Sequence, residues 1–322
     1  MIYEKAYKTL QGYECLSSCI GNYLMYDGIN INASDIFFLG NGFNITYNIN
    51  EKIIKTDMYE ANFKFMNLFG VKYEQKGFKD RISAIEFLKK SVLCEKKVII
   101  KVSSSFIKYN RVFSQSNNSP HYINVIGIKQ DEVYISDGFV PTRVASVYEG
   151  WISLDQIVSA WEAMEYRCLI LNFDKINFDK KMIQNNIKFK IQKGIKSYLD
   201  GSIYSDFCYG VTAVRKLLSE LNELILKDNF YESIVFMNYQ LRVYGFLSSK
   251  NMILAKIRDF GLSPNVCEGY ENVIKTWEKV LLLLIKVGIS KKLDTLDELI
   301  STVDDCIENE RSVLNDIVAL WR

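Results

Sequence analysis

The sequence predicts an α+β fold in which helices and an antiparallel sheet build the first half of the chain and helices build the second. Apolar residues recur at helical spacing up to about residue 95, and four short β-branched and aromatic runs follow before residue 174. From about residue 175 the strand-like runs fade and the helical spacing returns. Because the strands are mostly consecutive in the chain, we expect them to pair antiparallel. We therefore predict two domains, residues 1–174 and an all-helical region at residues 175–322.

The first predicted helix begins at Cys15 in "YECLSSCIGNYLMYDG", where apolar side chains repeat every three or four residues and Gly28 suits the end of a helix. "SDIFFLGNGF" predicts a helical turn that leads into a loop with Gly40, Asn41 and Gly42. "EANFKFMNLFGV" and "RISAIEFLKKSVLCEKK" predict two more amphipathic helices.

Four runs separated by turn residues are typical of strands: "KVIIKVSSSFI", "HYINVIGIKQ", "EVYISDGF" and "YRCLILNF". A predicted helix, "SLDQIVSAWEAM", lies between the last two, with Ser153 as its cap. If the second and third runs form a hairpin through "KQD", the start of one strand lies beside the end of the other. His121 and Asp137 are then neighbours at one edge of the sheet.

Long segments with a helical repeat of apolar residues make up the second half of the chain. They are "IKSYLDGSIYSDFCYGVTAVRKLLSELNELI", "FYESIVFMNYQLRVYGFLSSKNMILAKIRDFG", "NVIKTWEKVLLLLIKVGI" and "LDELISTVDDCIENERSVLNDIVALW". We expect these helices to pack on one another or on the first domain, with "KINFDKKMIQNN" as the linker.

The composition argues against several classes of partner. The chain of 322 residues has 40 Lys and Arg against 38 Asp and Glu, a net charge of +2, so no strong field favours nucleic acid or an anionic membrane. The longest apolar run, Val280 to Ile285, is far shorter than a membrane span, and the chain does not begin like a secretory signal. We therefore expect a cytoplasmic protein.

Seven cysteines are scattered along the chain without any CxxC pair, so we expect neither a metal site nor a disulfide framework. A nucleophilic cysteine must form the thiolate, and a helix N-terminus and a nearby imidazolium both lower a thiol pKa. Cys15 lies at the first position of its helix, whereas Cys19 lies one turn deeper on the apolar face. We interpret Cys15 as the reactive thiol and Cys19 as a core residue.

Cys15, His121 and Asp137 make a candidate set of nucleophile, base and orienting carboxylate. His121 is the only histidine in the chain. Each residue also has an ordinary structural role, as a buried thiol, a hydrogen-bonded imidazole and a turn former before glycine. Their joint placement favours catalysis, because a hairpin that brings the imidazole and the carboxylate together is not required by those structural roles.

"YECLSSCIGNYLMYDG" resembles the opening of the papain-like fold in bacteriocin-leader peptidases, in which two cysteines four residues apart begin the central helix. "HYINVIGI" and "EVYISDGF" are similar to the histidine and aspartate strands of that fold, and "YEGWISLDQIVSAW" fits as well. "SDIFFLGNGF" resembles the N-terminal domain of butirosin-type acyltransferases, in which a helical second domain follows. The resemblance covers roughly residues 10 to 173.

The resemblance implies an enzyme that moves an acyl group from a carrier-protein phosphopantetheine thioester to a small amine and needs no cofactor of its own. Related papain-like proteins form amides in thiotemplated peptide assembly, including closthioamide-type pathways. Carried over, Cys15 is the acyl-accepting nucleophile, His121 the base and Asp137 the orienting residue. A carrier protein is acidic, so "KFKIQKGIKSYL" at residues 188–199 is a candidate docking segment, although a solvated helix face is the more common explanation of such a lysine pattern.

For the oxyanion donors the sequence offers two alternatives. The peptidases usually place a glutamine several residues before the cysteine and a glycine after it, whereas here Gln11 lies four residues before Cys15 and Leu16 follows. Gln11 is one candidate donor. The others are the Cys15 backbone N–H together with Asn41 or an amide of Gly40 or Gly42.

Two further functions share these features. A stand-alone papain-like cysteine peptidase would use the same three catalytic residues, although the glycine loop and the helical half argue against it. The third possibility is a papain-like fold that acts as a non-catalytic binding module. In that case Cys15, His121 and Asp137 would not come together in the folded protein. Acyl transfer remains the favoured prediction.

Overall fold

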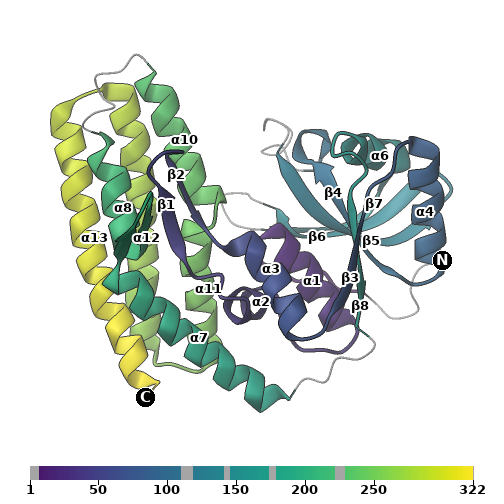
Figure 1. The fold of residues 1–322 in the computed structure, drawn as a ribbon, viewed down its shortest axis with the longest axis horizontal. Coiled ribbons are helices and arrows are strands. Elements are labelled where there is room, and N and C mark those ends of the chain that lie inside the picture. The colour runs from purple at the N-terminus through teal and green to yellow at the C-terminus, as the bar shows by residue number, and fades with distance from the viewer. Residues whose placement is uncertain (1–6, 110–118, 141–145, 174–178, 222–228, 322) are drawn as a thin grey trace. The chain divides into compact units, whose positions relative to one another are not determined.

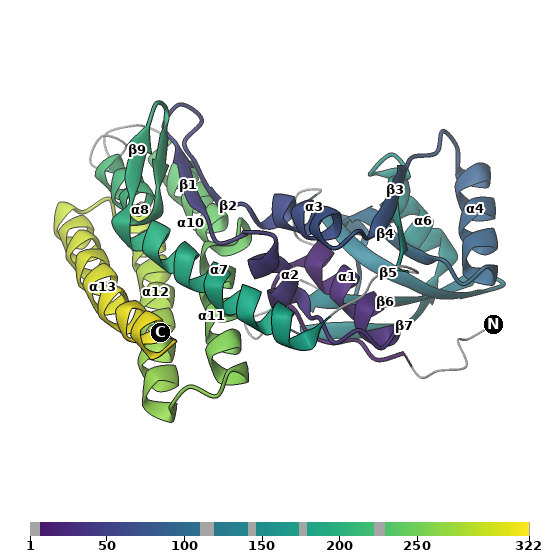
Figure 2. The same cartoon turned by 60° about the horizontal axis from the view of Figure 1, so that its bottom comes forward.

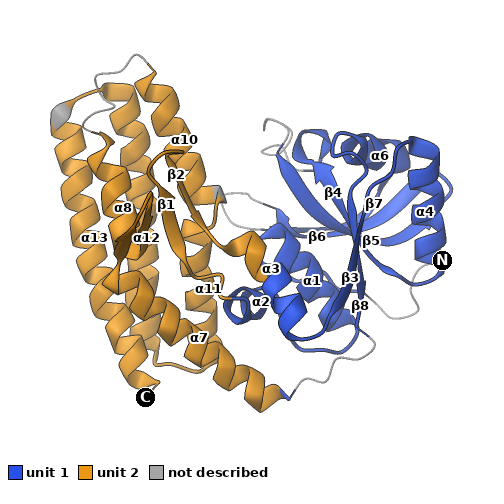
Figure 3. Cartoon of the chain, viewed as in Figure 1, with its two compact units in different colours: residues 1–40, 62–179 blue, residues 41–61, 180–322 orange. Residues whose placement is uncertain are grey.

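The computed structural model describes residues 7–109, 119–140, 146–173, 179–221 and 229–321 (Figure 1). Its contacts divide the chain into two compact units, residues 1–40 with 62–179 and residues 41–61 with 180–322 (Figure 3). The predicted boundary between residues 174 and 175 lies outside the described residues. Residues 41–61 were predicted in the first domain but belong to the second unit.

The first unit contains a six-stranded antiparallel sheet in the order β3-β8-β4-β5-β6-β7. The strands are β3 (Lys72–Lys76), β4 (Lys97–Ser103), β5 (Pro120–Lys129), β6 (Glu132–Val140), β7 (Ser146–Ser153) and β8 (Cys168–Asn172). The four predicted strands are confirmed, and β3 and β7 extend the sheet at its two edges. Both edge strands are mostly exposed or half-buried, so their sequences lack the apolar alternation that predicts a strand.

Five helices accompany this sheet: α1 (Cys15–Tyr26), α2 (Ala33–Leu39), α3 (Met58–Leu68), α4 (Arg81–Leu93) and α6 (Leu154–Glu162), with a short 3₁₀ turn η1 (Ser104–Phe106) after β4. Helices α4 and α6 cover one face, where side chains such as Leu88 and Trp161 pack on Ile100 and Val125. Helix α1 packs against β5 and β6 (Figure 1). On this second face the Tyr23 hydroxyl contacts the Val98 and Val125 carbonyls, both at 2.9 Å. The predicted α+β class is confirmed, and a cysteine-bearing helix on an antiparallel sheet is the papain-like arrangement.

The second unit holds the helices α7 (Lys180–Asp200), α8 (Gly210–Ser219), α10 (Phe230–Val243), α11 (Phe246–Asp259), α12 (Pro264–Ser290) and α13 (Leu293–Leu320). It also contains a four-stranded sheet in the order β2-β1-β10-β9 (Figure 2). These strands are β1 (Ile45–Asn48), β2 (Ile53–Thr56), β9 (Ser202–Tyr204) and β10 (Phe207–Tyr209). The C-terminal region is therefore not all-helical as predicted.

Two glycines explain why a hairpin interrupts the expected helix. Gly201 and Gly210 both have positive φ, at 58° and 59°, and enclose the β9–β10 hairpin. A Cβ on Gly201 would lie 2.3 Å from Thr212 Oγ1, and one on Gly210 would lie 2.2 Å from Tyr198 O. Strand β10 pairs with β1, from Thr46 with Tyr209 onward, and this pairing places residues 41–61 in the second unit.

A buried ion pair lies in the core of the second unit. Lys250 Nζ is 2.6 Å from Glu310 Oε1, and both residues are fully buried. The Tyr198 hydroxyl and the Trp277 indole N–H each donate to Glu310 Oε2 at 2.9 Å. The Lys250 ammonium also lies over the ring of Phe246, 4.3 Å from its centroid. These contacts supply the partners that a buried charge requires.

We predict that Lys250→Met lowers the free energy of unfolding by about 3 kcal/mol, because it leaves the Glu310 carboxylate buried without its cation. Adding Glu310→Leu to Lys250→Met should recover part of that loss, since no uncompensated charge remains. Urea unfolding of both variants measures the two effects. A loss below about 0.5 kcal/mol in Lys250→Met would show that the pair does not stabilise this unit.

Candidate active site

Glu14 caps the N-terminus of helix α1. Its Oε1 accepts from the Leu16 N–H at 2.8 Å, and its Oε2 accepts from the Ser17 N–H at 2.6 Å. The Asn62 side chain, from helix α3, also donates to Oε2 at 3.3 Å. These contacts fix the start of the helix, and with it the position of Cys15.

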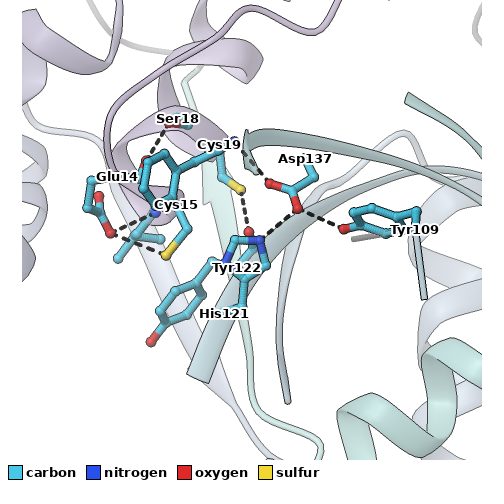
Figure 4. Close-up of polar contacts among 10 residues, drawn as sticks. Glu14, Cys15, Ser18, Cys19, Tyr109, His121, Tyr122 and Asp137 are labelled. Atoms are coloured by element: carbon cyan, nitrogen blue, oxygen red, sulfur yellow. Dashed lines mark hydrogen bonds and ion pairs between the residues drawn. The ribbon is translucent and has the colours of Figure 1, made fainter. Parts of the chain in front are cut away.

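The two cysteines of α1 have different surroundings. Cys15 is partly exposed, and its Sγ donates to Glu14 Oε1 at 3.4 Å (Figure 4). Cys19 is 1% exposed, and its Sγ donates to the Tyr122 carbonyl at 3.3 Å. Only Cys15 of this pair can be reached by a substrate, and the expected core position of Cys19 is confirmed.

His121 and Asp137 meet inside the sheet. They come from β5 and β6, which form the predicted hairpin with Lys129 paired to Glu132 beside the turn. The His121 Nε2 lies 2.7 Å from Asp137 Oδ2, and the two residues are 3% and 0% exposed. An imidazole that donates from Nε2 to a carboxylate has Nδ1 as its acceptor nitrogen. In Figure 4 that second nitrogen is on the side of the ring facing Cys15.

Tyr109 is a third partner of this pair that sequence reasoning missed. Its hydroxyl donates to Asp137 Oδ2 at 2.7 Å, and its ring stacks on Tyr148 of β7 at a centroid distance of 4.0 Å. Burial and the charge of Asp137 raise the pKa of the Tyr109 hydroxyl, which therefore remains a donor. The Phe139 N–H donates to Asp137 Oδ1 at 3.0 Å. No local pattern around Tyr109 signals this contact, because it depends on how three strands pack.

Tyr122 links the helix to the histidine strand. A backbone hydrogen bond from Tyr122 reaches the Cys15 thiol, while its carbonyl accepts from Cys19. Since Tyr122 directly follows His121, the thiol of Cys15 lies against the segment that carries the imidazole (Figure 4). The His121–Asp137 pair is thus joined by a hydrogen bond, and Cys15 contacts the residue that follows His121. The catalytic roles of the three residues stay a prediction.

The protonation state of Cys15 differs from the sequence-based expectation. Burial raises the pKa of the Cys15 thiol well above its ordinary value, and the Glu14 carboxylate raises it further. The helix start was expected to lower this pKa. It does not, because Glu14 already occupies the first amide groups of α1 and places a carboxylate beside the sulfur. The resting site therefore holds a thiol that must pass its proton to a base when it reacts. The acidic residue directly before Cys15 was the feature of the sequence that could have predicted a raised thiol pKa.

The four candidate oxyanion donors differ in their surroundings. Gln11 is exposed, and the Gly40 N–H already donates to the Ile36 carbonyl at 2.9 Å as the end of α2. Asn41 and Gly42 belong to the second unit, and Asn41 Oδ1 accepts from Lys190 Nζ at 2.7 Å. The oxyanion role of these four residues stays a prediction.

Within the described ranges, no group of three or more His, Cys, Asp or Glu side chains has an arrangement that could hold a metal ion. Over the same ranges, no helix combines the length and apolar character needed to cross a membrane.

We predict that iodoacetamide alkylates Cys15 but not Cys19 in the folded protein, because only Cys15 is accessible. Since the Cys15 pKa is raised, the thiolate is scarce at neutral pH, and the rate should still be increasing above about pH 8.5, where an ordinary thiol is half ionised. Peptide mapping of the alkylated protein across pH measures both effects. A rate already at its plateau at pH 7 would instead indicate a preformed thiolate–imidazolium pair.

Residues 14–138 match the family described as "Butirosin biosynthesis protein H, N-terminal". A solved C39-like peptidase from Bacillus anthracis aligns with 55% of this chain and 98% of its own, at 15% identity and a TM-score of 0.39. A comparison with curated proteins found no match. The predicted resemblance to the butirosin-type family is thus confirmed over residues 14–138.

Proposed function

We propose that this protein is a cysteine-dependent acyltransferase that forms an amide bond, moving an acyl group from a carrier-protein thioester to a small amine. The observation that carries the proposal is the partly exposed Cys15 in contact with Tyr122 of β5, directly after His121, whose imidazole pairs with Asp137 of β6. The family match over residues 14–138 supports the same class of chemistry. The pathway is a thiotemplated one, in which the acyl group arrives on phosphopantetheine.

The first half-reaction transfers the acyl group to Cys15. His121 Nδ1 takes the Cys15 proton, and the sulfur attacks the thioester carbonyl to form a tetrahedral intermediate. The bond to the phosphopantetheine sulfur then breaks, and His121 returns the proton to that leaving thiol. One thioester replaces another, so the step needs neither a redox partner nor a nucleotide.

The second half-reaction forms the amide. The amine nitrogen attacks the acyl-Cys15 carbonyl, the carbon–sulfur bond breaks, and a proton from the amine reaches the sulfur through His121. Asp137 stabilises the imidazolium that exists between the two proton transfers. Tyr109 and the Phe139 N–H hold Asp137 in place for that role.

The protonated resting state of Cys15 favours an activated donor over a peptide. A thioester is readily attacked, whereas an amide requires both a strong nucleophile and protonation of its leaving amine. Peptide hydrolysis is therefore the second candidate and not the first. A non-catalytic module is the third, and the assembled His121–Asp137 pair argues against it.

Helix α7 has the charge expected of a docking surface for an acidic carrier protein. It contains six lysines and one aspartate, although the whole chain has a net charge of only +2. None of these lysines forms an ion pair with a described residue. Met182 and Phe189 on the same helix are 50% and 59% exposed. Lys190 Nζ donates to Asn41 Oδ1 and Lys188 lies over the Phe260 ring, so neither charge is neutralised by a carboxylate. Positive charge around exposed apolar side chains fits the acidic, amphipathic helix of a carrier protein.

The proposed function predicts a covalent acyl adduct on Cys15. After mixing with acyl-loaded carrier proteins, intact-mass measurement should show the protein heavier by one acyl group, and an added amine should release the amide. Cys15→Ser should abolish the adduct without unfolding the protein, whereas Cys19→Ser should retain the adduct and lower stability. Hydrolysis of peptides without any acyl adduct would support the peptidase instead. Equal loss of activity in both variants, with no loss of stability, would contradict the roles given to the two thiols.

The docking surface predicts a charge-specific defect. Lys193→Glu with Lys196→Glu should slow acyl loading from the carrier protein by about tenfold at low salt, because it reverses charge on the exposed face of α7. Loading from a small free thioester should be unchanged. The matched control is Lys275→Glu with Lys279→Glu, which makes the same charge change on exposed positions of α12. Equal slowing in both double variants would show that only total charge matters.

A further inference from the structure

The Glu14 carboxylate has every acceptor position filled while Cys15 is unmodified. Oε1 accepts from the Leu16 N–H and from the Cys15 thiol, at 2.8 Å and 3.4 Å. Oε2 accepts from the Ser17 N–H and from the Asn62 side chain, at 2.6 Å and 3.3 Å. A carboxylate offers about four acceptor positions, two on each oxygen. Of the four donors, only the thiol proton is lost when Cys15 reacts.

Acylation of Cys15 therefore changes the surroundings of Glu14 in a defined way. An acyl-cysteine has no S–H, so Oε1 loses one of its two donors. The remaining three donors still hold the carboxylate beside the sulfur that carries the acyl group. The acceptor position that opens lies on Oε1, which is 3.4 Å from the sulfur of Cys15 in the free protein. A group bound there is held beside the thioester that it would attack.

The charges around the thiol also favour a particular kind of second substrate. The charged groups that raise the Cys15 pKa are Glu14 at the start of α1 and Asp137 from β6. For Cys19, one turn further along, the same two carboxylates raise the pKa, together with Cys15. The titratable groups packed on Asp137 are the imidazole of His121 and the hydroxyl of Tyr109. Two carboxylates acting on one sulfur produce a negative potential that attracts a cation.

We propose that Glu14 binds the acceptor amine, with Oε1 receiving an amine N–H in the acyl-enzyme in place of the Cys15 S–H of the free protein. The inference rests on the proposed function and names the residue and the substrate class for its second half-reaction. The substrate class is an amine that arrives as an ammonium ion and carries at least one N–H.

The proton balance of this step is complete. The ammonium passes one proton to Glu14 and becomes a neutral amine. Its nitrogen forms the bond to the acyl carbon as the carbon–sulfur bond breaks. A second proton leaves the nitrogen and reaches the Cys15 sulfur through His121. Glu14 then releases its proton to solvent and again accepts a hydrogen bond from the restored Cys15 thiol. The products are an amide, the free thiol and one proton.

The test uses three thiol reagents of one chemistry on the intact protein. 2-Aminoethyl methanethiosulfonate carries an ammonium with N–H groups, its trimethylammonium analogue carries the charge alone, and methyl methanethiosulfonate is neutral. Each transfers its alkylthio group to a thiolate and releases methanesulfinate. Peptide mapping gives the modification rate at Cys15, and the exposed Cys94 is the internal reference.

We expect the aminoethyl reagent to modify Cys15 faster than the neutral reagent. Glu14→Gln should lower the ratio of the aminoethyl rate to the neutral rate by about tenfold. The ratio for the trimethylammonium reagent should fall by less, because it has no N–H to donate. A ratio within twofold of the wild-type value in Glu14→Gln would overturn the proposal.

Asp80→Asn is the matched control. Asp80 caps α4 as Glu14 caps α1, with its Oδ1 accepting from the Ser83 N–H at 2.8 Å, but it has no thiol beside it. The ratio at Cys15 should not change in this variant. Glu14→Asp provides a second test should Glu14→Gln fail to fold, since aspartate is a good cap whose shorter side chain withdraws the carboxylate from the sulfur. It should lower the ratio in the same direction, and an unchanged ratio would count against the proposal.

Formation and breakdown of the acyl-enzyme show whether the amine site or the proposed function has failed. If wild type forms the acyl adduct and Glu14→Gln shifts its breakdown from aminolysis to hydrolysis, both are supported. If the adduct forms but the ratio of rates and the breakdown are unchanged in Glu14→Gln, the function stands and the amine site is wrong. If no adduct forms while the ratio still depends on Glu14, the cation site stands and acyl transfer is wrong.

Discussion

The carboxylate of Asp137 receives hydrogen bonds from three directions inside the protein, and the chemistry of the site depends on that arrangement. The His121 Nε2 and the Tyr109 hydroxyl meet Oδ2, each at 2.7 Å, and the Phe139 N–H meets Oδ1. The carboxylate is completely buried, so these donors replace the water that a charged group requires. They also fix the imidazole in one tautomer, with Nδ1 as the acceptor. A base oriented in this way can take a proton from a thiol that is not ionised beforehand.

Helix α1 supplies that thiol, and its cap determines how the thiol behaves. A helix N-terminus normally favours an anion, but here the anion is the Glu14 side chain and not the sulfur. The pKa of Cys15 is raised, and the nucleophile forms only when a base accepts its proton. Such a site suits an activated thioester donor. The same carboxylate lies beside the sulfur, so in our proposal one residue acts both in the resting state and in the second half-reaction.

The second unit is organised by constraints that do not involve this chemistry. Strands β1 and β2 come from the first half of the chain but belong to the sheet of the second unit, where β1 pairs with β10 of the β9–β10 hairpin. The Lys250–Glu310 pair is buried among aromatic rings. The pair and its contacts come from four helices, α7, α11, α12 and α13, so the pair favours one arrangement of those helices over others. Helix α7 carries six lysines, of which Lys193 and Lys196 are exposed. The unit thus combines a core held by a buried ion pair with a lysine-rich helix, which is the docking surface that we propose for an acidic partner.

Apolar spacing and turn residues in the sequence determined α1, the β5–β6 hairpin and the helical second half, because these features depend on neighbours within a few residues. The pairing of His121 with Asp137 followed from the hairpin for the same reason. The sequence did not determine the pKa of Cys15, the contact of Tyr109 with Asp137 or the transfer of residues 41–61 to the second unit. Each of these depends on groups far apart in the chain. Burial, the direction of a carboxylate and the partner of an edge strand exist only after the chain has folded, so the tertiary structure alone decided them.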